Sequence, residues 1–214
     1  KLAVNGSKND ALQALSAAPL FSGDFRLKNL PEIEDVKKLI EILQALGVKT
    51  IKRKEHELML NCDNFSHSAI EPEISKRLRG SVILTGPLLA RTGCAYFPHP
   101  GGCVIGERPI DIFLDGFQAL GAKVILEDKL HRVQAPPGGL RGGEIFFRYQ
   151  TVTGTETLLM AAVLARGVTI LKNCALEPEI ESLGRFLIKS GAKIEGLGPT
   201  PLKIRGGKLL KAPS

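Results

Sequence analysis

The stretch Ala119-Leu120-Gly121-Ala122-Lys123 occurs in closely related form at two other places in the chain. These are Ala45-Leu46-Gly47-Val48-Lys49 and Lys189-Ser190-Gly191-Ala192-Lys193, and successive glycines lie about 70 residues apart, a spacing typical of structural repeats. In each copy apolar residues at helical spacing lead up to the glycine, and a short β-branched segment follows it. Glycine at this point is the usual left-handed cap of a helix. The three stretches therefore predict three copies of a helix–strand unit.

A second helix ends upstream of each of these stretches. Its last turn is followed by Gly23, Gly93 or Gly167, and the first and third copies then match at a constant offset through Lys28-Asn29 and Lys172-Asn173. Each unit is thus expected to contain helix, strand, helix and strand in that order, with further strands between the units. The strands are expected at 25–27, 48–51, 57–60, 123–126, 144–147, 168–171 and 193–195.

The repeats predict one domain over residues 1–214, divided approximately into units 1–72, 73–147 and 148–214. Each unit mixes helices and strands, which indicates an α/β (α+β) fold. A doubly wound parallel sheet is the alternative, but that fold does not require a matched triplication.

The composition favours a small anionic partner. The 214 residues carry a formal net charge of +7 and a pI near 9.3, which favours the binding of anions. Nucleic acid and phosphorylated metabolites are both candidates. Aromatic residues make up only 5% of the chain and tryptophan is absent, so few side chains could stack on bases. Small phosphorylated molecules are therefore favoured over nucleic acid.

The chain is expected to be a soluble cytoplasmic protein with reduced thiols. No apolar run approaches the roughly 18 residues that span a bilayer, and Lys8, Asn9 and Asp10 interrupt the place where a secretion signal would lie. No two cysteines have the CxxC spacing of a zinc site or redox motif. We therefore expect no metal and no membrane partner. The free thiols are Cys62, Cys94, Cys103 and Cys174.

The middle copy departs from the other two in one segment. Between its first glycine and its second helix it is longer by four residues, which lie in the segment 94–109, CAYFPHPGGCVIGERP. The glycines of this segment allow a hinged loop, and the segment carries Cys103 and Arg108. A functional loop is one interpretation, and a tolerated surface insertion with a packed cysteine is the other.

The starts of the repeated first helices form a second departure. Lys8 and Arg79 stand at comparable helix N-termini in the first two copies, and Val152 stands there in the third. Unpaired N–H groups and the helix dipole make such ends anion sites, and capping does not require a cation there. Two hydroxyl–carboxyl pairs near these starts have the alternative interpretation of plain capping boxes: Ser7 with Asp10, and Thr153 with Glu156.

The segment 100–111, PGGCVIGERPID, resembles the signature PGGCxIGxRPxD of the UDP-N-acetylglucosamine enolpyruvyl transferases at every specified position. The resemblance runs from about Gly6 to the C-terminus. Thr151-Val152-Thr153-Gly154-Thr155 departs from the family's SVGAT, and Leu176 replaces the usual arginine. The further matches are Gly6-Ser7-Lys8-Asn9 for the family's GAKN, Leu78-Arg79-Gly80-Ser81 for its MRAS, and the segments 86–91 and 177–180.

The resemblance implies an inside-out α/β barrel of two domains, each built from three βαβαββ units, with the active site between the domains. This chain would be one such domain, and its partner would be the second domain of the same enzyme. Because half of the cleft is missing, the chain alone is expected to lack turnover.

The resemblance also implies roles for particular residues. Cys103 would be the catalytic loop thiol that donates a proton and that fosfomycin alkylates, while Lys8 and Asn9 would bind phosphoenolpyruvate. Asp111 would lie toward the uridine and Arg108 near the phosphates of UDP-N-acetylglucosamine. Neither a cofactor nor a metal is implied. The full set implied for UDP-N-acetylglucosamine is Arg79, Arg108, Pro109, Ile110, Asp111, Ile112, Tyr149, Gln150, Thr151 and Val152.

The implied reaction is an addition–elimination, the first committed step of peptidoglycan synthesis. C3 of phosphoenolpyruvate takes a proton, the sugar 3′-hydroxyl attacks C2, and phosphate leaves. The shikimate-pathway enolpyruvyl transferase is a weaker alternative, because it shares the fold but lacks the PGGC loop. From another class, the chain could be a basic repeat module that binds RNA, or part of an RNA-end-processing enzyme of similar architecture.

Overall fold

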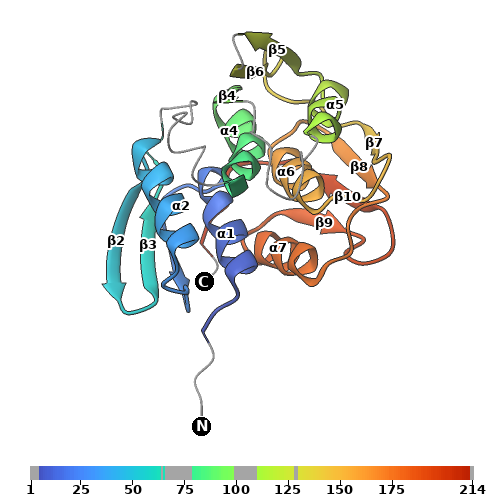
Figure 1. Ribbon diagram of the computed structural model, residues 1–214. Coiled ribbons are helices and arrows are strands. Elements are labelled where there is room, and N and C mark those ends of the chain that lie inside the picture. Colours follow the sequence, from blue (N-terminus) through green and yellow to red (C-terminus); the bar gives the residue numbers. More distant parts are fainter. Residues whose placement is uncertain (1–4, 64, 66–78, 99–109, 128–129, 213–214) are drawn as a thin grey trace, which may run out of the picture.

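The computed structural model describes residues 5–63, 65, 79–98, 110–127 and 130–212. Its helices and strands follow one recurring order (Figure 1). The first unit consists of α1 (Lys8–Ser16), the short 3-10 helix η1 (Ala18–Leu20), β1 (Asp24–Lys28), α2 (Glu34–Ala45), β2 (Lys49–Lys54) and β3 (Glu57–Asn61). The second consists of η2 (Arg79–Leu84), α4 (Thr85–Thr92), β4 (Cys94–Pro98), α5 (Asp111–Ala119), β5 (Lys123–Glu127) and β6 (Leu130–Gln134). The third consists of β7 (Glu144–Phe146), α6 (Val152–Val163), β8 (Val168–Lys172), α7 (Pro178–Lys189), β9 (Lys193–Glu195) and β10 (Leu202–Arg205).

The three sheets repeat one strand order. They are β1-β3-β2, β4-β6-β5 and β7-β8-β10-β9, so the last strand of each unit lies between two earlier ones. Those pairings are antiparallel, with Phe25 opposite Leu60 in the first sheet and Ala95 opposite Val133 in the second. β7 pairs in parallel with β8, so the third sheet takes a strand from before residue 148 and its unit is a complete βαβαββ. The predicted α/β fold with three such repeats is confirmed.

Glycines with positive φ end the helices at the repeated positions. Gly47, Gly121 and Gly191 follow the second helix of each unit with φ of 93°, 86° and 103°. Residues with a Cβ rarely adopt this left-handed conformation, which reverses the chain and directs it into the next strand. The repeated stretches thus act as the predicted helix stops.

The helices lie inside the domain and the sheets lie outside it. Figure 1 shows α6 at the centre, with the β1-β3-β2 sheet on one flank and the β7-β8-β10-β9 sheet on the opposite flank. Every residue from Gly154 to Val163 is buried, whereas the outer strand β2 is almost wholly exposed. A helix that is buried on all sides needs an almost uniformly small and apolar sequence, as the segment Leu158–Val163 has.

A glycine allows α4 to approach α6 closely. A Cβ at Gly86 would stand 2.1 Å from the carbonyl oxygen of Thr157. On the next helix a Cβ at Gly116 of α5 would stand 2.2 Å from Leu158. The contact at Gly86 is with the backbone, so α4 can pack this closely on α6 only because position 86 carries a hydrogen, whereas a Cβ at Gly116 would require the Leu158 side chain to move.

The sequence indicated a loop over the whole segment 94–109, but its first five residues form a strand. Cys94–Pro98 forms β4 and pairs with β6, because its alternating side chains fit one face of the second sheet. Residues 99–109 lie outside the described part of the chain.

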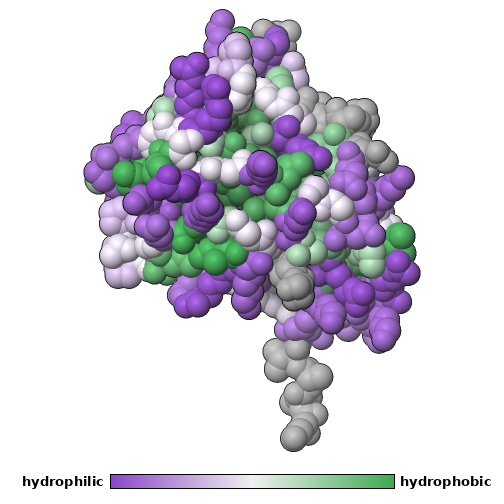
Figure 2. Space-filling model, turned by 180° about the vertical axis from the view of Figure 1, so that it is seen from behind, coloured by the Kyte–Doolittle hydropathy of each residue, from purple (hydrophilic) through white to green (hydrophobic). Residues whose placement is uncertain are grey.

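The surface combines a hydrophilic exterior with a local hydrophobic area. In the view from behind Figure 1, hydrophobic surface gathers in the middle and hydrophilic side chains surround and interrupt it (Figure 2). None of the helices in the described ranges is long and apolar enough to cross a membrane. The exposed large hydrophobic side chains of those ranges are Ile51, Leu126, Phe146, Tyr149, Leu176, Ile188 and Leu209.

Substituting Gly86→Ala should destabilise the domain. The new methyl group would clash with the backbone of α6, and such overpacking typically costs about 1–3 kcal/mol of the free energy of unfolding. Gly207→Ala is the matched control, because nothing lies within 4 Å of its added Cβ, and we expect a change within about 0.5 kcal/mol. Urea unfolding measures both. Equal effects of the two substitutions would contradict the close approach of α4 to α6.

Candidate functional site

The first turns of three helices meet around the N-terminus of α1. Lys8 is the first residue of α1, and its Nζ forms an ion pair with Asp35 in the first turn of α2. Asn9 follows, and its Nδ2 donates to Oε1 of Glu179 in the first turn of α7 at 2.9 Å. The helix start at Lys8, one of those predicted to bind an anion, is thus brought together with two carboxylates.

Lys8 at the N-terminus of α1 could bind an anion in place of the Asp35 carboxylate. The N-terminus of a helix carries a partial positive charge, so a lysine there is unfavourable unless an anion accompanies it. Asp35 is that anion in this structure, and the Lys8 side chain remains 54% exposed. A phosphate group would offer Lys8 the same negative charge and would also accept hydrogen bonds from the first N–H groups of α1.

Hydroxyl groups cap both α1 and α6. Ser7 Oγ accepts a hydrogen bond from the N–H group three residues later at 3.4 Å. Thr151 Oγ1 does the same at 3.2 Å for α6. The capping interpretation is therefore right for Ser7 and wrong for Thr153, because α6 is capped by Thr151 and the Glu156 side chain is buried.

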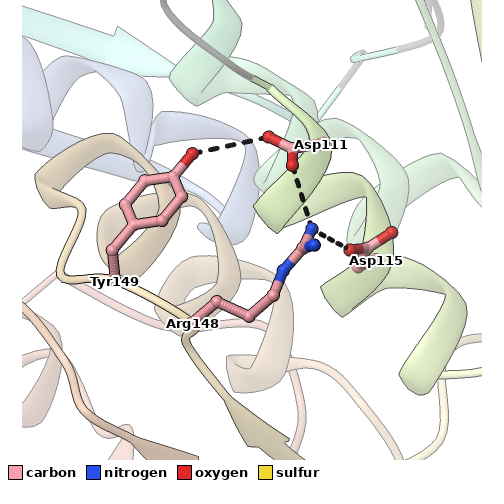
Figure 3. Close-up of polar contacts among 4 residues, drawn as sticks. All are labelled: Asp111, Asp115, Arg148 and Tyr149. Carbon is pink, nitrogen blue, oxygen red and sulfur yellow. Dashed lines mark hydrogen bonds and ion pairs between the residues drawn. The ribbon is translucent and has the colours of Figure 1, made fainter.

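A second polar cluster lies at the N-terminus of α5 (Figure 3). Arg148 points from the segment after β7 toward α5 and donates to Oδ2 of Asp111 and Oδ2 of Asp115, each at 2.9 Å. The Tyr149 hydroxyl lies 3.5 Å from the other oxygen of Asp111. Partial burial and the negative charge of Asp111 raise the pKa of the Tyr149 phenol, which therefore remains a donor.

This cluster gives Asp111 a defined orientation at a helix start. Asp111 and Asp115 are separated by one helical turn and would repel each other, and the Arg148 guanidinium pairs with both and reduces that repulsion. The Asp111 side chain is half exposed, so its carboxylate is accessible from solvent. Such a carboxylate can accept hydrogen bonds from the N–H groups of a bound ligand.

The segment from Tyr149 to Val152 is attached to the loop before α7. Gln150 Nε2 donates to the carbonyl oxygen of Cys174 at 3.2 Å. Thr155 Oγ1 accepts from the N–H of Ala175 at 3.1 Å and donates to the carbonyl oxygen of Thr151 at 2.7 Å. The Tyr149 and Gln150 side chains are exposed, whereas those of Thr151 and Val152 are half-buried.

Other residues of the predicted site differ in how they are placed. Ile110 and Ile112 are 7% and 5% exposed, so their side chains belong to the core and only their backbones could face a ligand. Arg79 opens η2, where only its backbone is described. Cys103, Arg108 and Pro109 lie outside the described residues.

A carboxyl group is buried beneath the second turn of α1. Glu156 on α6 is 7% exposed, and it accepts a hydrogen bond from Nε2 of Gln13, which is 2% exposed. Burial raises the pKa of Glu156 from 4.5 to about 7, against the lowering effect of the Gln13 hydrogen bond. Between these pH values the folded chain holds a proton that the unfolded chain releases. Glu156 therefore lowers the free energy of unfolding as pH rises from about 4.5 to about 7, by up to about 1.4 kcal/mol per pH unit.

Two of the described thiols are expected to be poor nucleophiles. Burial raises the pKa of Cys62 to about 12 and that of Cys174 to about 11, so both remain protonated at neutral pH. Cys94 is half-buried on β4. In the part of the chain that the structure describes, no group of three or more His, Cys, Asp or Glu side chains could hold a metal ion.

Sequence reasoning found the helix starts but missed the residues that contact them. Asp35, Asp115, Arg148 and Glu179 were not among the predicted site residues, and neither was the buried Gln13. Asp35, Arg148, Glu179 and Gln13 are distant in sequence from the residues they contact, so no local motif indicates these contacts. For Asp115, its spacing of one helical turn from Asp111 was a usable signal.

Comparisons with known proteins agree on one family. The chain matches the sequence profile of the family described as EPSP synthase (3-phosphoshikimate 1-carboxyvinyltransferase) over residues 1–213. Among curated proteins it is 44% identical over 206 residues to a UDP-N-acetylglucosamine 1-carboxyvinyltransferase of Koribacter versatilis, covering 95% of this chain and 47% of that protein. It is 42% identical over 208 residues to UDP-N-acetylglucosamine 1-carboxyvinyltransferase 2 of Carboxydothermus hydrogenoformans, covering 97% and 49%. The chain thus spans about half the length of the curated relatives it matches.

Solved structures share the fold at lower identity. The enolpyruvyl transferase NikO of Streptomyces tendae matches with a TM-score of 0.83 and 23% identity, covering 100% of this chain and 50% of that one. An EPSP synthase of Acinetobacter baumannii matches with a TM-score of 0.78 and 17% identity, covering 99% and 48%. These likenesses show that the arrangement of helices and sheets is that of one half of such proteins.

Cys62 and Cys174 should resist alkylation in the folded chain, and Cys103 should react first. At pH 8 a thiol with a pKa of 11 or above is ionised to about 0.1% or less, and the thiolate is the form that reacts. Brief iodoacetamide treatment followed by mass mapping measures the order of modification. In urea all four thiols should react at similar rates, which serves as the control. Modification of Cys62 or Cys174 before Cys103 would contradict the prediction.

Proposed function

The chain belongs to the EPSP synthase family over residues 1–213, and on that premise we propose that it is one domain of a UDP-N-acetylglucosamine enolpyruvyl transferase. The reaction transfers the enolpyruvyl group of phosphoenolpyruvate to the 3′-hydroxyl of UDP-N-acetylglucosamine. It is the first committed step of peptidoglycan synthesis, and the enzyme acts in the cytoplasm. The second domain of the same enzyme is the partner of this chain.

The choice of acceptor substrate is supported by the difference in sequence identity. The two relatives named for UDP-N-acetylglucosamine are 44% and 42% identical to this chain, whereas the EPSP synthase structure is 17% identical. None of the relatives and structures named above is described as an RNA-binding protein. The sequence observation that carries the proposal is the segment PGGCVIGERPID at 100–111.

In this proposal the N-terminus of α1 binds the phosphate of phosphoenolpyruvate. Lys8 exchanges Asp35 for the phosphate, and Asn9 contributes an amide. The geometry supports this assignment, because Lys8 lies at the positive end of α1, where a lysine is unfavourable unless it binds an anion. The phosphate is also the leaving group, so the charge of Lys8 stabilises it as the C–O bond breaks.

The N-terminus of α5 and the segment 149–152 bind the nucleotide in this proposal. Asp111 accepts hydrogen bonds from the uracil, and Arg148 and Tyr149 hold its carboxylate in place. Ile110 and Ile112 contribute their backbones, since their side chains are buried. The remaining residues assigned to UDP-N-acetylglucosamine are Arg79, Arg108, Pro109, Gln150, Thr151 and Val152.

Cys103 donates the proton in the proposed addition step. The thiol proton moves to C3 of phosphoenolpyruvate while the 3′-hydroxyl oxygen bonds to C2 and gives up its own proton to water. In the elimination step C3 returns a proton to the Cys103 thiolate, the double bond re-forms, and phosphate departs with the electrons of its C–O bond. Nothing is oxidised or reduced overall, so the reaction requires no redox cofactor. Fosfomycin alkylation of Cys103 belongs to the same proposal.

A chimeric enzyme tests the function directly. This chain would replace the matching half of the Koribacter versatilis relative, and release of phosphate from phosphoenolpyruvate would be measured with UDP-N-acetylglucosamine as acceptor. We expect turnover by the chimera and none by the chain alone. Cys103→Ser should abolish turnover, whereas the matched variant Cys94→Ser should retain it. A folded chimera that accepts shikimate 3-phosphate instead, or turnover by the chain alone, would refute the proposal.

Lys8→Ala should weaken binding of phosphoenolpyruvate without destabilising the fold. The Lys8–Asp35 ion pair is exposed, so its loss should change the free energy of unfolding by less than about 1 kcal/mol. A charged hydrogen bond to phosphate contributes about 1.5–3 kcal/mol, equivalent to a ten- to hundredfold loss of affinity. Thermal unfolding and calorimetry on the chimera measure the two quantities.

The matched control for Lys8 is Lys52→Ala. Lys52 also forms a surface ion pair, with Glu32 at 2.7 Å, but it lies on the outer strand β2. The substitution Lys52→Ala should leave the affinity for phosphoenolpyruvate unchanged. Lower stability with unaltered affinity in Lys8→Ala would mean that Lys8 is architectural.

A further inference from the structure

Two amides on one face of α1 contact carboxyl groups on two other helices. Asn9 and Gln13 are separated by one helical turn, so they point the same way. Asn9 contacts Glu179 at the start of α7, and Gln13 contacts Glu156 within α6. We call these contacts the outer and the inner amide–carboxyl pair. The outer pair is exposed and the inner pair is buried.

The inner pair has an unused acceptor that a protonated carboxyl group could satisfy. Gln13 Nε2 donates to Glu156, but Gln13 Oε1 is buried and has no hydrogen-bond partner among the described residues. A carboxylate has no hydrogen to donate, whereas a neutral carboxylic acid has one O–H group. Neutral Glu156 can therefore make a two-point pair, accepting from the amide nitrogen and donating to the amide oxygen. Burial of a polar atom without a partner is costly, which favours this form.

The surroundings of Glu156 also favour the neutral form. Glu177 and Glu179 at the start of α7 are the charged residues whose effect on it is resolved, and both raise its pKa, which lies near 7. On α1 it faces the uncharged Gln13. Among the side chains that the structure describes, the other charged ones on elements that pack against α6 are Arg91 of α4, Asp111 and Asp115 of α5, Glu181, Arg185 and Lys189 of α7, Lys172 of β8, and Lys203 and Arg205 of β10.

α1 buries fewer apolar side chains than the other α-helices of the described residues do. It has only 9 residues, and Ala11 and Leu15 are its only buried apolar side chains. The Lys8–Asp35 and Asn9–Glu179 contacts at its start are exposed, and exposed contacts constrain a helix weakly. The inner pair is the buried polar connection between α1 and α6, and it lies just over one turn from Lys8.

We propose that Gln13 and Glu156 are positioning residues of the anion site: their two-point pair fastens α1 to α6 and thereby places Lys8 and Asn9 for phosphate. Ionisation of Glu156, with loss of its proton to water, breaks one of the two hydrogen bonds and loosens the start of α1. Anion binding at Lys8 and Asn9 is then coupled to the proton on Glu156. The inference rests on the proposed function in so far as that function assigns phosphate to these two residues.

Backbone NMR of the 214-residue chain tests the positioning without any ligand. As pH rises from 5.5 to 8.5, the amide signals of Lys8 and Asn9 should shift with the same midpoint as the Glu156 carboxyl carbon. Glu156→Gln keeps the size of the side chain and can form an amide–amide pair, so its Lys8 and Asn9 signals should not titrate near neutral pH. Glu181→Gln, an exposed carboxyl of α7 paired with Arg185, should behave like the unsubstituted chain.

Sulfate binding tests the coupling, because sulfate remains a dianion throughout this pH range. The affinity of the unsubstituted chain should fall roughly three- to tenfold between pH 6 and pH 8.5, which is the size of ordinary coupling between two sites. The affinity of Glu156→Gln should stay constant. Both are measured from the shifts of the Lys8 and Asn9 signals during sulfate titration.

The possible outcomes separate this inference from the proposed function. Lys8 and Asn9 signals that do not follow Glu156 in the unsubstituted chain, or an equal pH slope of sulfate affinity in Glu156→Gln, would overturn the positioning role. Signals that follow Glu156 while sulfate fails to bind at any pH would support the positioning role and count against the phosphate assignment. The first measurement requires no variant, so a variant that failed to fold would not leave the question open.

Discussion

The approach of α4 to α6 at Gly86 is the contact on which the rest of the domain depends. Because a Cβ there would stand 2.1 Å from the Thr157 carbonyl oxygen, the two helix backbones touch with nothing between them. This contact brings α6 into the interior, where every residue from Gly154 to Val163 is buried. Because α6 fills the interior, the three sheets pack around the helices on the outside. Each sheet covers the core with one face and presents the other face to water.

The same arrangement makes a site out of helix starts. A helix in the interior has its ends at the surface, and its first N–H groups are unpaired there. Around α1 the first turns of α2 and α7 supply Asp35 and Glu179, and these carboxylates occupy the positive end when no anion is present. At α5 the two carboxylates, Asp111 and Asp115, belong to the helix itself, and Arg148 from the segment after β7 forms ion pairs with both. The two clusters therefore differ in chemistry although the repeats that carry them are alike.

Burial assigns different work to side chains that look alike in the sequence. Glu156 and Glu179 are both carboxyl groups beside an amide of α1, yet the Glu179 contact is exposed, whereas Glu156 is buried and its burial raises its pKa to about 7. Cys62 and Cys174 are buried in the same way and are poor nucleophiles as a result. Ile110 and Ile112 belong to the core although they flank Asp111. In the proposed enzyme, the groups that meet the substrates are those that the interior packing has left at the helix starts.

The sequence alone was sufficient for the repeats, for the strands other than β4, β6 and β10, and for the helix stops, because these follow from local causes. Left-handed glycines such as Gly47, apolar stripes at helical spacing and β-branched segments act on neighbouring residues. It was also sufficient for the placement of Lys8 and Val152 at helix starts, and for the resemblance that the comparisons bear out. Only the tertiary structure decided which carboxylate meets which amide, which residue caps α6, and that Glu156 is buried against Gln13. The two amide–carboxyl contacts join residues from different repeats, and they depend on how closely three helices pack, which the periodicity of a single repeat does not determine.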